Sequence, residues 1–215
     1  MDKPPCPASA SGSRDANQAR PEYDLTVTAA KPQEYVPYDV FLRNEVSNDD
    51  RHEWVDGVVY AMSRGSPEHG RLAGRVTARM LSPFLEDGCE IFSSDTAIFI
   101  EAAQHHTYAD ASLVCGALCT RTVYDKNSKS IGEAIVNPTL IVEVLSDATE
   151  RYDRDGKFES YKKLPSFEAY VLVSQAERRI EVRAREGQQW RTQIGSTGQT
   201  IRVHGRQFAV DAIYA

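Results

Sequence analysis

One carboxylate stands inside the most apolar segment of the chain. Glu143 lies in Leu140–Leu145, where every neighbour is aliphatic, and such a continuous run is typical of a strand buried on both faces. An ionised carboxylate in an apolar interior costs several kcal/mol unless it has a partner. Glu143 should therefore be neutralised, paired with a lysine or arginine, or bound to a metal ion. On this segment alone, a structural ion pair and a metal site are equally good explanations.

A second acid, Asp110, lies in another strand-like segment, residues 107–114. An acid is unfavourable in a strand, although many aspartates at strand ends only cap turns. If the strands of Asp110 and Glu143 are neighbours, the two side chains offer the hard oxygen ligands that Mg²⁺ prefers when phosphate and water complete its shell. Mn²⁺ is a possible substitute.

A lysine follows these acids on a predicted helix over residues 149–163. Asp153, Lys157 and Tyr161 are spaced four residues apart, which puts them on nearly one face of that helix. The ammonium group could reach the carboxylates, with Asp153 and Tyr161 holding it by hydrogen bonding and packing. A solvated helix face explains the same spacing equally well.

The remaining patterns predict the elements that would position these side chains. Residues 1–33, rich in Pro, Ala and Ser, are expected to be a flexible tail, and residues 34–215 one domain. Helices are expected at 38–42 and from Ser66 to Gly88, with a hairpin around Asp56-Gly57. Further strands are expected at 90–92, 96–100, 109–115, 138–146 and 169–173, loops at 116–137, and an antiparallel meander over 180–203. This order predicts an α/β (α+β) fold, a mixed β-sheet flanked by helices.

Composition sets limits on the function. The chain has 215 residues, of which 41% are hydrophobic, enough for one packed domain. No apolar run is long enough to span a membrane and the first ten residues contain no export signal, so we expect a cytoplasmic protein. The net charge of −6 counts against a protein that holds nucleic acid by phosphate contacts alone.

The cysteines are predicted to be free thiols, because their spacing is irregular and nothing indicates secretion. The chain has four, at Cys6, Cys89, Cys115 and Cys119. A zinc site that combines the last two with His105 and His106 is the weaker alternative, since the spacing matches no common zinc pattern.

Six stretches, in order, resemble the Uma family of putative restriction endonucleases, a branch of the PD-(D/E)xK nuclease superfamily. The resemblance runs from about Tyr35 to the C-terminus and leaves out only the predicted tail. The stretches are Glu53–Gly57, Ser66–His69, Ala109–Ser112, Leu140–Ser146, Asp153–Lys157 and Tyr170–Val173.

The resemblance implies a restriction-endonuclease-like fold that binds DNA and a divalent metal. Asp110 and Glu143 would be the signature acids, and the backbone carbonyl of Val144 a further metal ligand. Lys157 would be the signature lysine, moved from the strand to the following helix. Two departures affect this assignment. Ala109 replaces the proline before the aspartate, and Leu145 replaces the strand lysine, which leaves the identity of the activating group open.

Two more residues are candidates for the site. Glu53 resembles the additional acid that many such nucleases bring from an early element, and it could complete the metal site or bind a second ion. An exposed hairpin carboxylate is the alternative. His69 could contact phosphate or orient a ligand, although a lone helix histidine is more often packed or solvated.

Together with these residues, the resemblance implies a magnesium-dependent endonuclease that hydrolyses DNA phosphodiester bonds, with Lys157 assisting. The alternatives are a non-catalytic module that binds nucleic acid or protein on the same fold, and a hydrolase of a smaller phosphoester. No helix-turn-helix or zinc finger is visible, so sequence preference cannot be read. A homodimer is possible.

Overall fold

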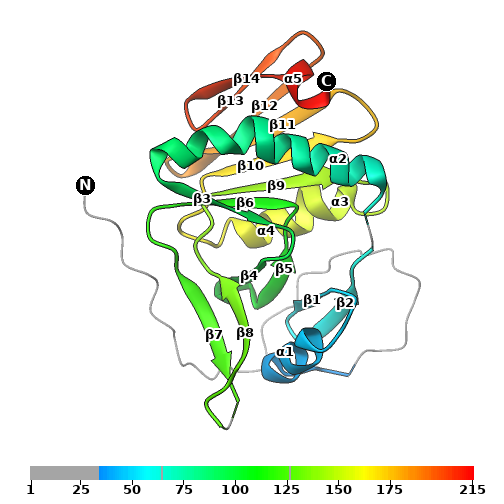
Figure 1. Ribbon diagram of the computed structural model, residues 1–215, viewed down its shortest axis with the longest axis vertical. Coiled ribbons are helices and arrows are strands. Elements are labelled where there is room, and N and C mark those ends of the chain that lie inside the picture. The colour runs from blue at the N-terminus through cyan, green and yellow to red at the C-terminus, as the bar shows by residue number, and fades with distance from the viewer. Residues whose placement is uncertain (1–33, 64, 126) are drawn as a thin grey trace.

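The structure is a computed structural model that describes residues 34–215 except residues 64 and 126, so the tail predicted for residues 1–33 lies outside the described part. The strands form two six-stranded sheets and a two-stranded ribbon. Figure 1 shows the N-terminal helix and hairpin at one end of the molecule and the C-terminal ribbon at the other. The predicted α+β class is confirmed, although its strands divide between two sheets instead of one.

The first sheet has the strand order β2-β1-β5-β4-β8-β7. Its strands are β1 (His52–Val55), β2 (Val58–Ala61), β4 (Ala97–Ile100), β5 (His105–Tyr108), β7 (Thr120–Tyr124) and β8 (Ser130–Ile135). The predicted hairpin joins β1 to β2, and Asp56 and Gly57 have φ values of 45° and 89°, as a two-residue hairpin turn requires. Helix α1 (Tyr38–Val46) contacts β1 and β8.

Two features of this sheet differ from the sequence prediction. The segment 116–137, predicted to be loops, contains the β7–β8 hairpin. The strand-like segment predicted over residues 107–114 is interrupted at Ala109 and Asp110, which lie between β5 and β6 instead of within a strand. The hairpin lies at the edge of the sheet and most of its residues are exposed or half-buried, so its sequence lacks the apolar alternation that reveals a strand.

The second sheet carries the candidate acids and has the order β12-β11-β10-β9-β6-β3. Its strands are β3 (Cys89–Ser93), β6 (Ala111–Cys115), β9 (Leu140–Leu145), β10 (Ala169–Ser174), β11 (Arg179–Glu186) and β12 (Gln189–Ser196). Central strand β9 pairs antiparallel with β6 and parallel with β10. All six residues of β9 are buried, as its aliphatic run predicts.

The long helix that begins after Ser66 covers one face of this sheet (Figure 1). Helix α2 (Pro67–Val76) starts at Ser66, whose side chain accepts the N–H of His69. It continues through a π turn, Thr77–Leu81, and a 3₁₀ segment, Ser82–Asp87. It ends at Gly88, whose φ of 75° suits glycine, so the predicted start and end are both confirmed.

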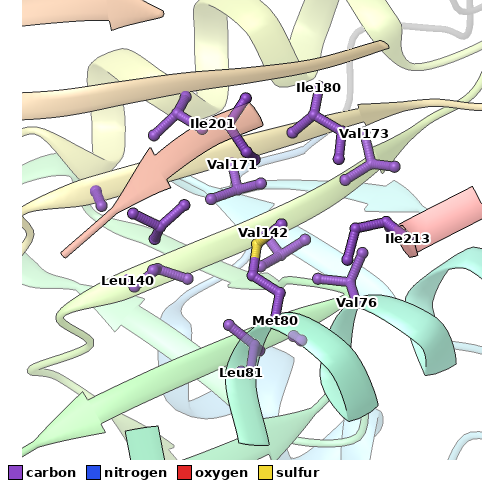
Figure 2. Packing of buried hydrophobic residues seen from close by; sticks show 14 of the residues in the cluster. Val76, Met80, Leu81, Leu140, Val142, Val171, Val173, Ile180, Ile201 and Ile213 are labelled. Atoms are coloured by element: carbon purple, nitrogen blue, oxygen red, sulfur yellow. The ribbon is translucent and has the colours of Figure 1, made fainter. Parts of the chain in front are cut away.

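Figure 2 shows the core beneath this helix, where side chains from α2 and its π turn meet those of the central strands. Val76 and Met80 pack against Val142 of β9 and Val171 of β10, and all four are fully buried. Residues at even positions of β9 thus face this core, while Glu143, between them, faces the opposite side.

A second helix covers that opposite side. It consists of α3 (Glu150–Tyr152), a π turn (Asp153–Lys157) and α4 (Phe158–Tyr161), which confirms the helix predicted over residues 149–163. Phe158 and Tyr161 pack with Ile141 of β9 and Tyr170 of β10 in a separate core cluster.

The C-terminal region is only partly as predicted. Strands β11 and β12 pair antiparallel, but β13 (Thr200–Val203) pairs with β14 (Arg206–Ala209) instead of extending the meander. The chain then forms α5 (Val210–Tyr214), which was not predicted and which contacts α2.

The prediction of free thiols is wrong. Cys89 and Cys115 are directly opposite each other on β3 and β6 and form a disulfide, and no cysteine in the described part of the chain is free. Spacing along the sequence does not reveal a partner brought close by strand pairing. A zinc site on Cys115 is thereby excluded as well. Among the described helices, none is long and apolar enough to cross a membrane.

Candidate active site

Glu143 is buried at the centre of the site, with 4% of its surface exposed. Its Oε1 accepts hydrogen bonds from Lys157 Nζ at 3.2 Å and from the Tyr161 hydroxyl at 3.0 Å. Oε2 makes no hydrogen bond or ion pair with the residues that the structure describes. The hydrogen bonds from the described side chains thus converge on one oxygen of this carboxylate.

Lys157 is surrounded by acceptors. Its ammonium nitrogen lies 3.0 Å from Glu53, 3.2 Å from Glu143 and 3.5 Å from Asp153. It also donates to the backbone carbonyl of Tyr108 at 3.2 Å. The helix lysine thus reaches the strand acids, and the solvated helix face is excluded because Asp153 and Lys157 are both buried.

Glu53 is buried too, which overturns the alternative of an exposed hairpin carboxylate. It comes from the other sheet, on β1. Its carboxylate accepts hydrogen bonds from Thr107 at 2.6 Å and Tyr152 at 2.9 Å, and lies 3.6 Å from the ring of His105. Strand β5 therefore contributes Thr107 and His105 to the site, and sequence reasoning missed both together with Tyr152.

Asp110 lies at the rim of the site, immediately before β6, with 16% of its side chain exposed. Its Oδ2 accepts the backbone N–H of Val144 at 2.6 Å and lies 3.2 Å from the Nε2 of His69. Oδ1 has no such partner among the described residues. Because Val144 follows Glu143 directly, this hydrogen bond brings the two predicted ligands together at one position on β9.

The buried acids of this cluster outnumber its buried cations, and the pKa values of these groups are shifted accordingly. Burial raises the pKa of Glu143 well above its usual value, and Asp153 and Asp110 raise it further, although Lys157 opposes them. Burial alone would lower the pKa of Lys157, but Glu143 and Glu53 raise it well above its usual value. Burial would raise the pKa of Glu53, yet the ammonium of Lys157 and other donors lower it. One ammonium is thus shared by several buried acids.

The excess of acids over cations and the presence of carboxylate oxygens are both suited to binding a small divalent cation. Asp110 and Glu143 offer carboxylate oxygens, the ligands that Mg²⁺ prefers. No three or more His, Cys, Asp or Glu side chains in the described ranges are arranged as a ready-made metal cage. Mg²⁺ commonly takes only one or two carboxylates, with water and substrate phosphate completing its shell.

His69 contacts Asp110, a candidate metal ligand, and is therefore not a solvated helix histidine. The hydrogen bond with Asp110 raises the pKa of His69, so the protonated ring is favoured beside this carboxylate. The side chain is 20% exposed. His69 can therefore orient Asp110, which is one of the two roles considered for it.

Comparison with known proteins gives consistent matches. A family model described as "Uma2: Putative restriction endonuclease" matches residues 30–209. Two uncharacterized proteins of Synechocystis are similar over most of the chain. The protein slr1290 is 33% identical over 81% of this chain and 88% of its own length, and sll1609 is 26% identical over 70% and 81%.

A solved structure shares the fold. The crystal structure of a putative nuclease belonging to DUF820 from Anabaena variabilis covers 78% of this chain and 91% of its own, with a TM-score of 0.56 and 13% sequence identity. At this identity the likeness shows the fold alone.

Proposed function

Because the chain belongs to the Uma2 family of putative restriction endonucleases, we propose that it is a metal-dependent endonuclease that hydrolyses phosphodiester bonds of DNA. One observation carries the proposal. Glu143, buried on β9, and Asp110, hydrogen-bonded to the next residue of β9, each keep one oxygen free of partners within the described structure, beside a buried lysine.

Asp110 and Glu143, with the backbone carbonyl of Val144, would hold Mg²⁺ or Mn²⁺. When bound, such an ion polarises the scissile phosphate and lowers the pKa of a water molecule. Lys157, on the inner side of Glu143, would donate hydrogen bonds to the attacking water or to the phosphate and stabilise developing negative charge.

The remaining side chains would hold these groups in place. Glu53 and Asp153 fix the ammonium of Lys157 from two sides, and Tyr161 fixes the carboxylate of Glu143. His69 fixes Asp110. Partners of this kind orient ligands and keep their geometry between turnovers.

One observation favours the alternative, a non-catalytic module that binds nucleic acid or protein. The ammonium of Lys157 already has four oxygen atoms within 3.5 Å, from Glu53, Glu143, Asp153 and the Tyr108 carbonyl. A lysine that only neutralises buried acids would look the same. Metal binding and cleavage separate the two proposals.

The test is cleavage of supercoiled and linear DNA in Mg²⁺, Mn²⁺ or EDTA. We expect the wild-type protein to cut DNA and the variants Asp110→Asn, Glu143→Gln and Lys157→Met to lose this activity. Glu45→Gln is the matched control. Like the site acids, the Glu45 side chain is largely buried, with 8% exposed, but it lies on α1 and accepts a hydrogen bond from the backbone N–H of His52. No cutting by wild type in any metal, with no metal binding by calorimetry, would overturn the proposal.

Light scattering of the same wild-type sample, with and without DNA, gives its mass in solution. A mass of twice 24.0 kDa would establish a homodimer, and the monomer mass under both conditions would exclude one.

A further inference from the structure

The helix that carries Lys157 contains a π turn, and this turn aligns the side chains of the site. In an α-helix every fourth residue lies about 40° beyond a full turn. A π turn takes more residues, so four residues fall short of a full turn. The step from Asp153 to Lys157 spans the π turn, and the step from Lys157 to Tyr161 spans the α-helical turn. The first step rotates less than a full turn and the second rotates more, so the two deviations from a full turn partly cancel.

The result is that Asp153, Lys157 and Tyr161 lie on the helix face directed at the site. Asp153 contacts Lys157, and both Lys157 and Tyr161 contact the same oxygen of Glu143. A regular α-helix would turn Tyr161 about 80° away from Asp153. The geometry of the proposed site therefore depends on the π turn.

A π turn disturbs the backbone hydrogen bonds of a helix, and buried carbonyl groups need donors. Two side chains from the sheet supply them here. The hydroxyl of Tyr170 donates to the carbonyl of Asp153 at 2.9 Å, and Nη1 of Arg183 donates to the carbonyl of Arg154 at 2.5 Å.

These two donors form a matched pair on neighbouring strands. Tyr170 of β10 and Arg183 of β11 are directly opposite in the strand register. Both pack on Phe158, the first residue after the π turn. The Tyr170 ring stacks on it at 5.6 Å, and the Arg183 guanidinium lies 4.6 Å from its ring centre. Glu181 holds Arg183 in place at 2.7 Å.

We propose that Tyr170 and Arg183 are positioning residues that stabilise the π turn and thereby keep Lys157 among the carboxylates. Both side chains bind the helix backbone, and neither has a hydrogen bond or ion pair with Asp110 or Glu143 among the described residues. The inference rests on the proposed role of Lys157 in the reaction, but its structural part can be tested without cleavage.

The test compares Tyr170→Phe and Arg183→Gln with matched controls in the full chain. Tyr170→Phe keeps the stacked ring and removes only the hydroxyl. Tyr214→Phe is its control, since the Tyr214 hydroxyl also donates to backbone carbonyls, those of Ser174 and Arg179. Arg185→Gln is the control for Arg183, because it lies on the same strand and donates to carbonyls elsewhere.

The first readout is the ¹⁵N NMR signal of the Lys157 ammonium, assigned by its absence in Lys157→Met. We expect it to shift or broaden in Tyr170→Phe and Arg183→Gln and to stay unchanged in both controls. Arg183→Lys, which keeps one donor, should restore the signal in part. An unmoved signal in a folded Tyr170→Phe variant would overturn the proposal, whether or not the wild type cuts DNA.

The second readout is cleavage kinetics, with thermal unfolding measured in parallel. Displacing a catalytic group by about 1 Å can cost on the order of 100-fold in rate. We expect kcat to fall by about 10- to 100-fold for both variants with KM nearly unchanged. The controls should keep wild-type kcat even if their melting temperatures fall equally. Equal losses of kcat in variants and controls would show that only stability was changed.

Discussion

The backbone N–H of Val144 donates a hydrogen bond to the carboxylate of Asp110 at 2.6 Å. This contact joins the start of β6 to β9 one residue after Glu143, and it uses only one of the two oxygens of Asp110. Asp110 thus stabilises the fold through this hydrogen bond and is also proposed to bind the metal ion. Different substitutions at Asp110 distinguish these two roles.

Replacing Asp110 by Asn should keep the fold and remove the ligand charge. An amide oxygen can still accept the N–H of Val144, so unfolding free energy should change by less than about 1 kcal/mol. Asp110→Ala loses the acceptor and should cost about 1–3 kcal/mol. Both should weaken Mg²⁺ binding at least about tenfold. Urea unfolding and calorimetry measure the two effects, and undiminished Mg²⁺ affinity in both variants would exclude Asp110 as a ligand.

Removing the ammonium of Lys157 should be strongly destabilising. Lys157→Met leaves Glu53, Glu143 and Asp153 buried without their shared cation, and loss of one partner of a buried ion pair typically costs about 3–5 kcal/mol. Adding Glu143→Gln to Lys157→Met should recover part of this loss. Urea unfolding at pH 7 provides the comparison. If Lys157→Met is as stable as wild type, the acids are protonated or hydrated independently of the lysine.

Glu143 and Lys157 could be proposed as site residues from the sequence, each for its own physical reason. Glu143 is unfavourable within an aliphatic strand, and Lys157 has the right spacing on a helix. Thr107, His105 and Tyr152 carry no such signal. Thr107 and His105 reach the site because β5 pairs with β1, which is far away in the chain, and Tyr152 reaches it by donating to Glu53 from helix α3. No local pattern encodes either contact.

Element prediction succeeded where local chemistry decides the structure. The Asp56-Gly57 turn and the Gly88 helix end both need residues that tolerate positive φ. It failed for the β7–β8 hairpin, whose strands pair mainly with each other at the sheet edge and bury few side chains. It also missed the disulfide between Cys89 and Cys115, because strand register alone creates that contact.

His106 should make the fold sensitive to mild acid. It is almost fully buried in the aromatic cluster around Tyr38, and burial lowers its pKa from 6.5 to about 3. The unfolded chain therefore takes up a proton below about pH 6.5 that the folded chain does not, so stability present above this pH is lost as the pH falls.

The expected loss from this one group is about 1.4 kcal/mol per pH unit between about pH 6 and 4. His106→Phe keeps an aromatic ring in the cluster and removes the titrating group. Urea unfolding at several pH values should give a shallower acid dependence for His106→Phe than for wild type. Parallel curves for the two proteins would show that His106 is protonated in the folded state too.

The disulfide between Cys89 and Cys115 should contribute measurably to stability. The two residues are separated by 26 positions in sequence, and closing a loop of this size lowers the entropy of the unfolded chain by an amount worth about 3.5 kcal/mol. Cys89→Ala combined with Cys115→Ala should therefore lower the unfolding free energy by about this amount, because the strand pairing of β3 with β6 remains. None of the site acids lies on β3 or β6, and Asp110 precedes the end of β6 opposite to Cys115, so DNA cleavage by the folded double variant should match wild type. Urea unfolding without reductant makes the measurement, with thiol titration of the wild type under denaturing conditions to establish that the bond is formed. Two reactive thiols at these positions in the purified wild-type protein, or equal stability of the double variant, would contradict a stabilising disulfide here.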